Sequence, residues 1–421
     1  MARDRDSVFK DISTLSVGFL IAQFIPFLVQ IPLRRIFEIE VFANYSVYLS
    51  AIGISSILTS LRYESAIVIP KEDKDANAIA ISTLFLNLIV SIIILALTFL
   101  FKNPLLKLFP FSDSYAGWLH LCPIGVWLIS SYNTLNYVLV RVKGFRGISV
   151  NKVARRSAEG TVHISSSIMN LPVGLILGDL VGNFVNIISA IFQIKKKRFV
   201  LRGISVKRFF YTLRKYSDFP INYGITSFFN MVCLLVPILI IKQFYGDEVA
   251  GQYDLARTVL LLPNILIARS ISQVLLQKTT ERVREGQTFT KDVGTVFLLT
   301  LVLTLGEMIV ILLFSKPLFT LLFGMKWEYA AGMSKILVFG FAANFLASPF
   351  SVIFIALRKL KLLAIWQILF SLIILSLYLC KNLDETSFMK LYSSSMVFIY
   401  SLQGFLIIFI SRKYHQSVTK G

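Results

Sequence analysis

Two arginines fall inside a predicted membrane-spanning helix over residues 252–276, where ionisable side chains are rare. At about 100° per residue, Arg257 and Arg269 lie with Asp254 in one sector of about 120°. Two cations would therefore face the same space, and intramembrane charges usually mark a functional site. In the alternative interpretation Asp254, three residues before Arg257, neutralises it as an ordinary ion pair.

Another charged pair lies near the end of the predicted helix 43–69. Arg62 and Glu64 are separated by one residue, at the expected boundary between membrane and cytoplasm. Arg62 could face a ligand from this position. The alternatives are an ion pair with a neighbour, or a long side chain that reaches the cytoplasmic surface.

A polar stripe marks the predicted helix 153–171. Arg155, Glu159 and His163 recur every four residues, so they lie on one helix face, which serine and asparagine side chains extend. Asp179 heads a similar stripe on the predicted helix 174–194. These stripes indicate either a hydrated cavity wall or ion pairs and hydrogen bonds that join helices. Glu159, His163 and Asp179 could also bind a coupling proton or sodium ion.

Motifs for several enzyme classes are absent from the sequence. The three cysteines and three histidines show no metal-site spacing. No phosphate-binding GxxxxGK[ST] loop, GxSxG nucleophile motif or HExxH zinc motif occurs. We therefore expect a transporter without cofactor or metal, and no enzyme.

The composition explains where these polar residues must lie. Of 421 residues, 56% are hydrophobic and only 16% are charged, with a mean hydropathy of +0.72. This excludes a soluble protein, and it makes a membrane a better explanation than nucleic acid for the net charge of +20. Runs of about 20 apolar residues predict about twelve transmembrane helices. Their ranges are 12–33, 43–69, 77–101, 117–140, 153–171, 174–194, 220–243, 252–276, 293–314, 333–356, 361–380 and 388–411.

The distribution of lysine and arginine predicts the orientation. With the N-terminus inside, cytoplasmic segments hold 31 of the 43 cations and the opposite side holds 10. Both termini are therefore expected in the cytoplasm. The run Lys195 to Arg198 reads as a topology signal, with contact to anionic lipids as the alternative.

Weak matches at nearly constant offset suggest an internal duplication. Residues 41–46 resemble 249–254, and residues 101–106 resemble 314–319. An offset of six helices predicts two bundles related by an axis along the membrane normal. We expect six-helix bundles over 1–194 and 219–421, joined by a basic linker over 195–218.

Four segments, in order, resemble Wzx-type O-antigen and capsule flippases of the multidrug/oligosaccharidyl-lipid/polysaccharide exporter superfamily. They are LRYESAIVIP (61–70), PVGLILG (172–178), YSDFP (216–220) and AGQY (250–253). The resemblance implies alternating access, a bacterial inner-membrane location and an undecaprenyl-diphosphate-linked oligosaccharide as cargo, for lipopolysaccharide or another polysaccharide. It also implies that the protein acts together with a polysaccharide polymerase and a chain-length regulator.

The resemblance implies a cationic lumen, and by position this role falls to Arg62, Arg257 and Arg269. Arginine suits a diphosphate because its planar fork matches phosphate oxygens. Glu64, Glu159, His163, Asp179 and Asp254 remain candidates for cavity-lining or ion-coupling residues. The alternatives are a multidrug exporter of the same superfamily, a peptidoglycan-precursor flippase, or a scaffold of polysaccharide assembly without a transport path.

Overall fold

The computed structural model describes residues 24–220, 224–263 and 267–419, apart from the side chains of Pro263, Arg269 and Thr419. Most of these residues are helical, and the described ranges contain no β-strand. The predicted all-α class is therefore confirmed. The chain divides into two compact units, Met1–Leu235 and Val236–Gly421. The proposed boundaries of the bundles and the linker stay predictions.

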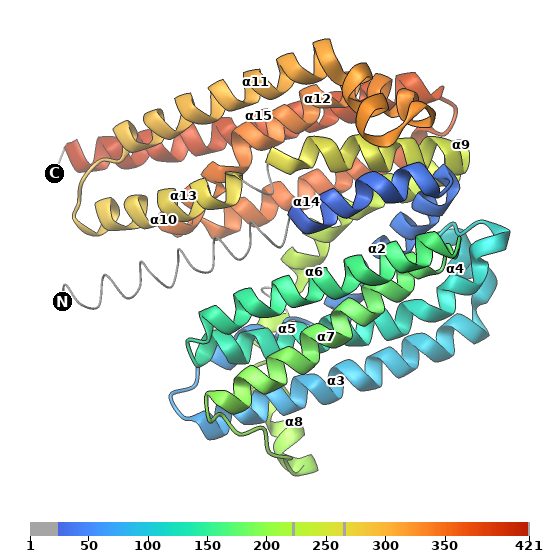
Figure 1. Cartoon of the computed structure of the whole chain (residues 1–421). Coiled ribbons are helices and arrows are strands. Elements are labelled where there is room, and N and C mark those ends of the chain that lie inside the picture. The colour runs from blue at the N-terminus through green and yellow to red at the C-terminus, as the bar shows by residue number, and fades with distance from the viewer. Residues whose placement is uncertain (1–23, 221–223, 264–266, 420–421) are drawn as a thin grey trace. The chain divides into compact units, whose positions relative to one another are not determined.

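The first unit is a bundle in which α5 packs against three other helices and α6 packs mainly on α7 (Figure 1). Helical residues 24–36 precede α2. The elements are α2 (Ile39–Ser60), η1 (Tyr63–Val68), α3 (Asp73–Leu100), α4 (Lys102–Leu108), η2 (Asp113–Leu121), α5 (Cys122–Arg141), α6 (Phe145–Ile168), α7 (Gly174–Lys196) and α8 (Val206–Lys215).

Small side chains allow the helices of this unit to approach closely. Ala66, Ala76, Ala80 and Ala190 are fully buried where η1, α3, α5 and α7 meet. Between lipid-facing helices, close van der Waals packing replaces the hydrophobic effect as the main attraction, and small residues permit it. This packed core holds the polar faces of α6 and α7 in fixed positions.

The second unit contains long helices, with α12 packed against both α11 and α15 (Figure 1). The helix α9 (Ile225–Pro263) begins in the first unit and bends at Gly246, whose φ of 83° is in the left-handed region. The remaining elements are α10 (Arg269–Arg284), α11 (Thr290–Phe323), η5 (Met325–Trp327), α12 (Glu328–Ala347), η6 (Ser348–Ser351), α13 (Val352–Ala356), α14 (Leu360–Ser376), η7 (Leu377–Cys380) and α15 (Glu385–Thr419).

Eight helical segments of the described chain are long and apolar enough to cross a membrane, so the protein is a multi-pass membrane protein. The helix α6 is not among them because it carries five charged residues. The predicted span 252–276 falls on α9 and α10, and residues 264–266 lie outside the described residues. The predicted linker contains a helix, α8, that charge counting alone did not indicate.

Candidate functional site

A break after α2 positions Arg62. The helix ends at Ser60, and the next two residues, Leu61 and Arg62, have φ values of 46° and 63°. Each non-glycine residue in this left-handed region costs about 1–2 kcal/mol. Strained backbone of this kind is concentrated at functional sites, where the surrounding packing maintains it. The break turns the chain from α2 into η1.

Arg62 is only partly neutralised by its neighbours. Its Nη1 lies 3.3 Å from the Oε1 of Glu64, and its Nε donates a hydrogen bond to the Oγ of Ser227 at 3.0 Å. Glu64 is buried, whereas the Arg62 side chain is 33% exposed. No described residue accepts a hydrogen bond from its Nη2. The predicted neighbouring ion pair is therefore present, and Arg62 keeps donors that an anion could use.

Four charged side chains join α6 to α7; we call Arg155, Arg156, Glu159 and Asp179 the α6/α7 cluster. The guanidinium of Arg156 contacts both carboxylate oxygens of Glu159, at 2.9 and 2.8 Å. The Nη2 of Arg155 lies 3.2 Å from Asp179, while its Nε is 3.9 Å from Glu159. Two cations thus balance two buried carboxylates.

A hydroxyl from α2 and an amide one turn along α7 complete the hydrogen bonds of Asp179. Its Oδ2 accepts a hydrogen bond from the Tyr48 hydroxyl on α2 at 3.2 Å, and its Oδ1 accepts one from Asn183 at 3.0 Å. His163 does not pair with a carboxylate; its Nε2 lies 2.8 Å from the carbonyl oxygen of Leu175. Both oxygens of Asp179 are therefore bonded, as a buried carboxylate requires.

Three glycines at every fourth position of α7 explain how the helices come so close. A Cβ on Gly174 would lie 2.0 Å from Ser166, and one on Gly178 would lie 2.2 Å from the Cδ2 of His163. A Cβ on Gly182 would lie 3.0 Å from the backbone oxygen of Arg155. This glycine row is the small-xxx-small pattern of closely packed membrane helices. It brings the α6/α7 cluster together.

In the second unit, Arg257 differs from the clustered arginines. It is half-buried on α9, and no hydrogen bond or ion pair joins it to another described residue. Asp254, one turn earlier, does not form the ion pair with it that the alternative interpretation required. Arg269 is the first residue of α10, but its side chain lies outside the described residues.

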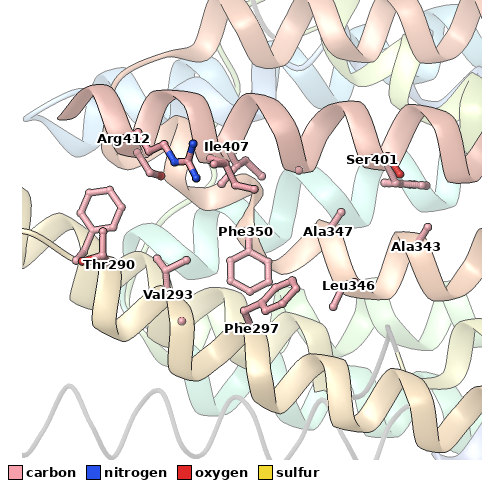
Figure 2. Close-up of a pocket in the computed structure, with 16 residues that line it drawn as sticks. Thr290, Val293, Phe297, Ala343, Leu346, Ala347, Phe350, Ser401, Ile407 and Arg412 are labelled. Atoms are coloured by element: carbon pink, nitrogen blue, oxygen red, sulfur yellow. The ribbon is translucent and has the colours of Figure 1, made fainter. Parts of the chain in front are cut away.

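The second unit also contains a half-open apolar cavity of about 450 Å³ between α11, η6, α12 and α15. Figure 2 shows the rings of Phe297 and Phe350 in its middle, with Arg412 at one end and Ser401 at the other. The ring centroids of the two phenylalanines are 6.2 Å apart. Glycines contribute to the space, because a Cβ on Gly294 or Gly404 would meet no atom within 4 Å.

Two residues of these sites were not predicted from the sequence. Arg156 lies three residues before Glu159, a spacing that could have identified it. Tyr48 is 131 residues from Asp179, so no local pattern connects them. In the part of the chain that is described, no group of histidine, cysteine, aspartate and glutamate side chains could hold a metal ion.

The fold is that of transporters of the MOP superfamily. The inward-closed lipid II flippase MurJ matches with a TM-score of 0.74 and 14% identity, over 95% of this chain and 87% of that one. An inward-facing multidrug resistance MATE family transporter matches with a TM-score of 0.65 and 14% identity, over 96% of this chain and 94% of that one. A third match is a MOP superfamily transporter from Pyrococcus furiosus, which is described as having a binding pocket of reverse polarity. Its TM-score is 0.61 and its sequence identity is 12%, over 96% of both chains.

Sequence comparison gives the family. Residues 33–332 match the family described as polysaccharide biosynthesis protein, which covers most of the chain. The chain therefore belongs to this family. No curated protein matches it by sequence. The chain is thus a multi-pass membrane protein of the polysaccharide biosynthesis family with the fold of MOP superfamily transporters, and both the family and the fold agree with the expectation from sequence.

Proposed function

We propose that the protein is a flippase that moves an undecaprenyl-diphosphate-linked oligosaccharide from the cytoplasmic to the periplasmic face of the bacterial inner membrane by alternating access. The oligosaccharide would be a repeat unit of O-antigen, capsule or exopolysaccharide. Membership of a polysaccharide biosynthesis family supports a sugar-bearing cargo. A polysaccharide polymerase and a chain-length regulator would act on the product.

The observation that carries this proposal is Arg257. A charged side chain at the centre of a bilayer costs about 2.5–3.5 kcal/mol on insertion scales, so an arginine there needs a reason to be retained. Arg257 makes no ion pair with a described residue. A diphosphate head group, with about two negative charges, would supply the missing partner in a form that the guanidinium fork binds well.

Arg62 serves as a second phosphate ligand in this proposal. Its Nη2, from which no described residue accepts a hydrogen bond, and the backbone break would present a guanidinium edge to the head group, while Glu64 limits the freedom of the side chain. Arg269 has the same role by its place at the start of α10. The carboxylates Glu159, Asp179 and Asp254, with His163, remain proposed coupling residues.

A flipping assay in proteoliposomes tests the proposal directly. We expect Arg257→Ala and Arg62→Ala to lower the rate by about tenfold to hundredfold, because a hydrogen bond to a charged group contributes about 1.5–3 kcal/mol. Arg257→Lys should restore part of the loss, since it keeps the charge without the fork. Lys390→Ala, at an exposed position on α15, is the control. Full activity in both arginine variants would exclude the proposed phosphate contacts.

A peptidoglycan-precursor flippase is the second candidate, favoured by the TM-score of 0.74 against the lipid II flippase. Both functions use a lipid diphosphate, so the arginine variants cannot separate them. Transport assays with vesicles that contain either lipid II or an undecaprenyl-diphosphate oligosaccharide can separate the two functions. Transport of the second lipid alone supports our proposal, and transport of lipid II alone replaces it. Drug resistance without movement of either lipid would indicate a multidrug exporter.

A further inference from the structure

The ten-residue helix α8 is amphipathic, with an apolar side and a cationic side. Ser205 caps its start by accepting a hydrogen bond from the backbone N–H of Arg208 at 3.3 Å. At about 100° per residue its apolar side chains fall in one arc of about 100°, and its cations fall in a separate arc of about 120°. The apolar residues are Val206, Phe209, Phe210 and Leu213, and the cations are Lys207, Arg208, Arg214 and Lys215.

One side of α8 is fixed to the first unit. The ring of Phe209 meets Phe85 of α3 edge to face, with centroids 5.7 Å apart. The hydroxyl of Tyr63 donates a hydrogen bond to the carbonyl oxygen of Leu213 at 3.0 Å. Arg208 forms an ion pair with Asp75 at the start of α3. These contacts define which side of α8 faces the protein.

The opposite side of α8 leaves apolar side chains uncovered. Val206 is 73% exposed and Phe210 is 64% exposed. They are adjacent on the helical wheel, and the exposed cations Lys207 and Arg214 flank them on one edge. An apolar ridge beside cations suits the boundary between acyl chains and phosphate groups, because the long basic side chains can reach the head groups.

The contacts of α8 with α3 place it at that boundary. The first turn of α3 is charged up to Asp75, and the mainly apolar run that follows to Leu100 carries no charged residue. Arg208 pairs with Asp75, outside this run, whereas Phe209 contacts Phe85, within it. Figure 1 shows α8 beside α3 and directed across it. A helix at this level meets the membrane surface on the predicted cytoplasmic side.

We propose that α8 is an interfacial helix that binds anionic phospholipids of the cytoplasmic leaflet. Val206 and Phe210 enter the acyl region, and Lys207 and Arg214 contact the phosphates. The neighbouring basic run Lys195 to Arg198 adds to the attraction. A cytosolic protein partner is disfavoured, because the ring of Phe210 lies beside Phe209, and Phe209 contacts Phe85 within the mainly apolar run of α3.

Depth measurements on the full-length protein test the placement. Spin labels at Phe210→Cys and Tyr211→Cys, in a Cys380→Ala background, would be compared in phospholipid nanodiscs. Cys122 and Cys233 are buried, and labelling of the background protein gives the blank. We expect label 210 to collide with oxygen more often than with a water-soluble nickel chelate, and label 211 to show the reverse. Equal chelate access at both positions would overturn the proposal and leave the ridge available to a protein partner.

A second measurement tests lipid binding. Native mass spectrometry would count the phosphatidylglycerol retained after transfer from nanodiscs that contain no cargo lipid. Lys207→Gln/Arg214→Gln should weaken retention by about tenfold, since each cation near an anionic surface contributes to binding. Lys381→Gln/Lys390→Gln removes the same charge from exposed positions on the opposite predicted side and should leave retention unchanged. Equal retention by the two double variants would overturn the proposal.

Discussion

The α6/α7 cluster of the first unit and Arg257 of the second unit differ in how their charges are balanced. In the first unit, the α6/α7 cluster pairs its two arginines with two carboxylates and packs them tightly through a row of glycines. In the second unit, Arg257 has no ion pair with a described residue, and α11, α12 and α15 surround an apolar cavity. Charge that is paired stabilises a helix interface, and charge that is unpaired is available to a ligand.

The largest expected effect comes from breaking the α6/α7 cluster. Glu159→Leu removes a carboxylate that both arginines approach, and leaving buried charges unpaired costs about 3–5 kcal/mol. The free energy of unfolding in detergent measures the loss. Arg156→Met added to Glu159→Leu should recover a large part of it, because the surplus cation is gone.

The second unit supplies the matched control for that experiment. Glu307 on α11 forms no ion pair with a described residue, and its Oε2 has no hydrogen-bond partner. Glu307→Leu should therefore leave stability unchanged or raise it, since it removes an acid that nothing compensates. If Glu159→Leu and Glu307→Leu destabilise equally, the contrast between the units is wrong.

A smaller effect is expected from adding a methyl group where α6 and α7 touch. Gly178→Ala would place a Cβ 2.2 Å from His163 and 3.1 Å from the backbone oxygen of Glu159, so the helices must separate. We expect a loss of about 1–3 kcal/mol in thermal unfolding experiments. Gly404→Ala on α15 meets no atom within 4 Å and should be neutral or stabilising. Equal losses would show that the glycine row is not a packing constraint.

Filling the apolar cavity should raise the free energy of unfolding instead of lowering it. Gly294→Leu would extend a side chain into the space between α11 and α15 and raise stability by about 0.5–2 kcal/mol, as cavity-filling substitutions commonly do. Gly306→Leu lies on the same helix away from the cavity and gives the gain from helix propensity alone. The difference in melting temperature between these variants is the measurement, and a zero difference would mean that the cavity is already filled by lipid.

The smallest expected effect concerns Asp384, which precedes α15 outside the membrane-spanning segments. Hydrogen bonding by Ser387 lowers the pKa of Asp384, first through the Ser387 side chain and then through its backbone N–H, which donates to the carboxylate at 3.0 Å. A lowered pKa adds stability above the ordinary pKa of aspartate, about 3.9, and the contribution disappears as the pH falls through the folded-state value. Asp384→Asn should therefore lower the melting temperature slightly at neutral pH and not at strongly acidic pH.

Hydrophobic runs were sufficient to predict the helical class and most spans. The gap between the predicted spans 220–243 and 252–276 matches the break of α9 at Gly246, where the backbone is not helical. The helix α8 was not predicted, because its many cations made the segment 195–218 look like a cytoplasmic loop. Its apolar side chains, which recur at three- and four-residue intervals, are visible only on a helical wheel.

The candidate residues were predictable where their partners share a helix. Arg155 and Glu159 are four residues apart, and Arg62 and Glu64 are two apart, so sequence spacing already joined them. The ion pair of Arg155 with Asp179 and the bond from Tyr48 depend on how α2, α6 and α7 pack. That packing follows from the glycine row, whose effect appears only when the facing helix is known.

The polarity of α6 has a consequence for how the protein enters the membrane. With five charged residues, α6 alone would be a poor substrate for insertion, because each charge near the bilayer centre costs about 2.5–3.5 kcal/mol. The helix α7 follows after the short connection 169–173 and carries both the matching glycine row and the carboxylate that pairs with Arg155. We therefore expect insertion of α6 to depend on synthesis of α7, so that the two helices enter the bilayer as one hairpin.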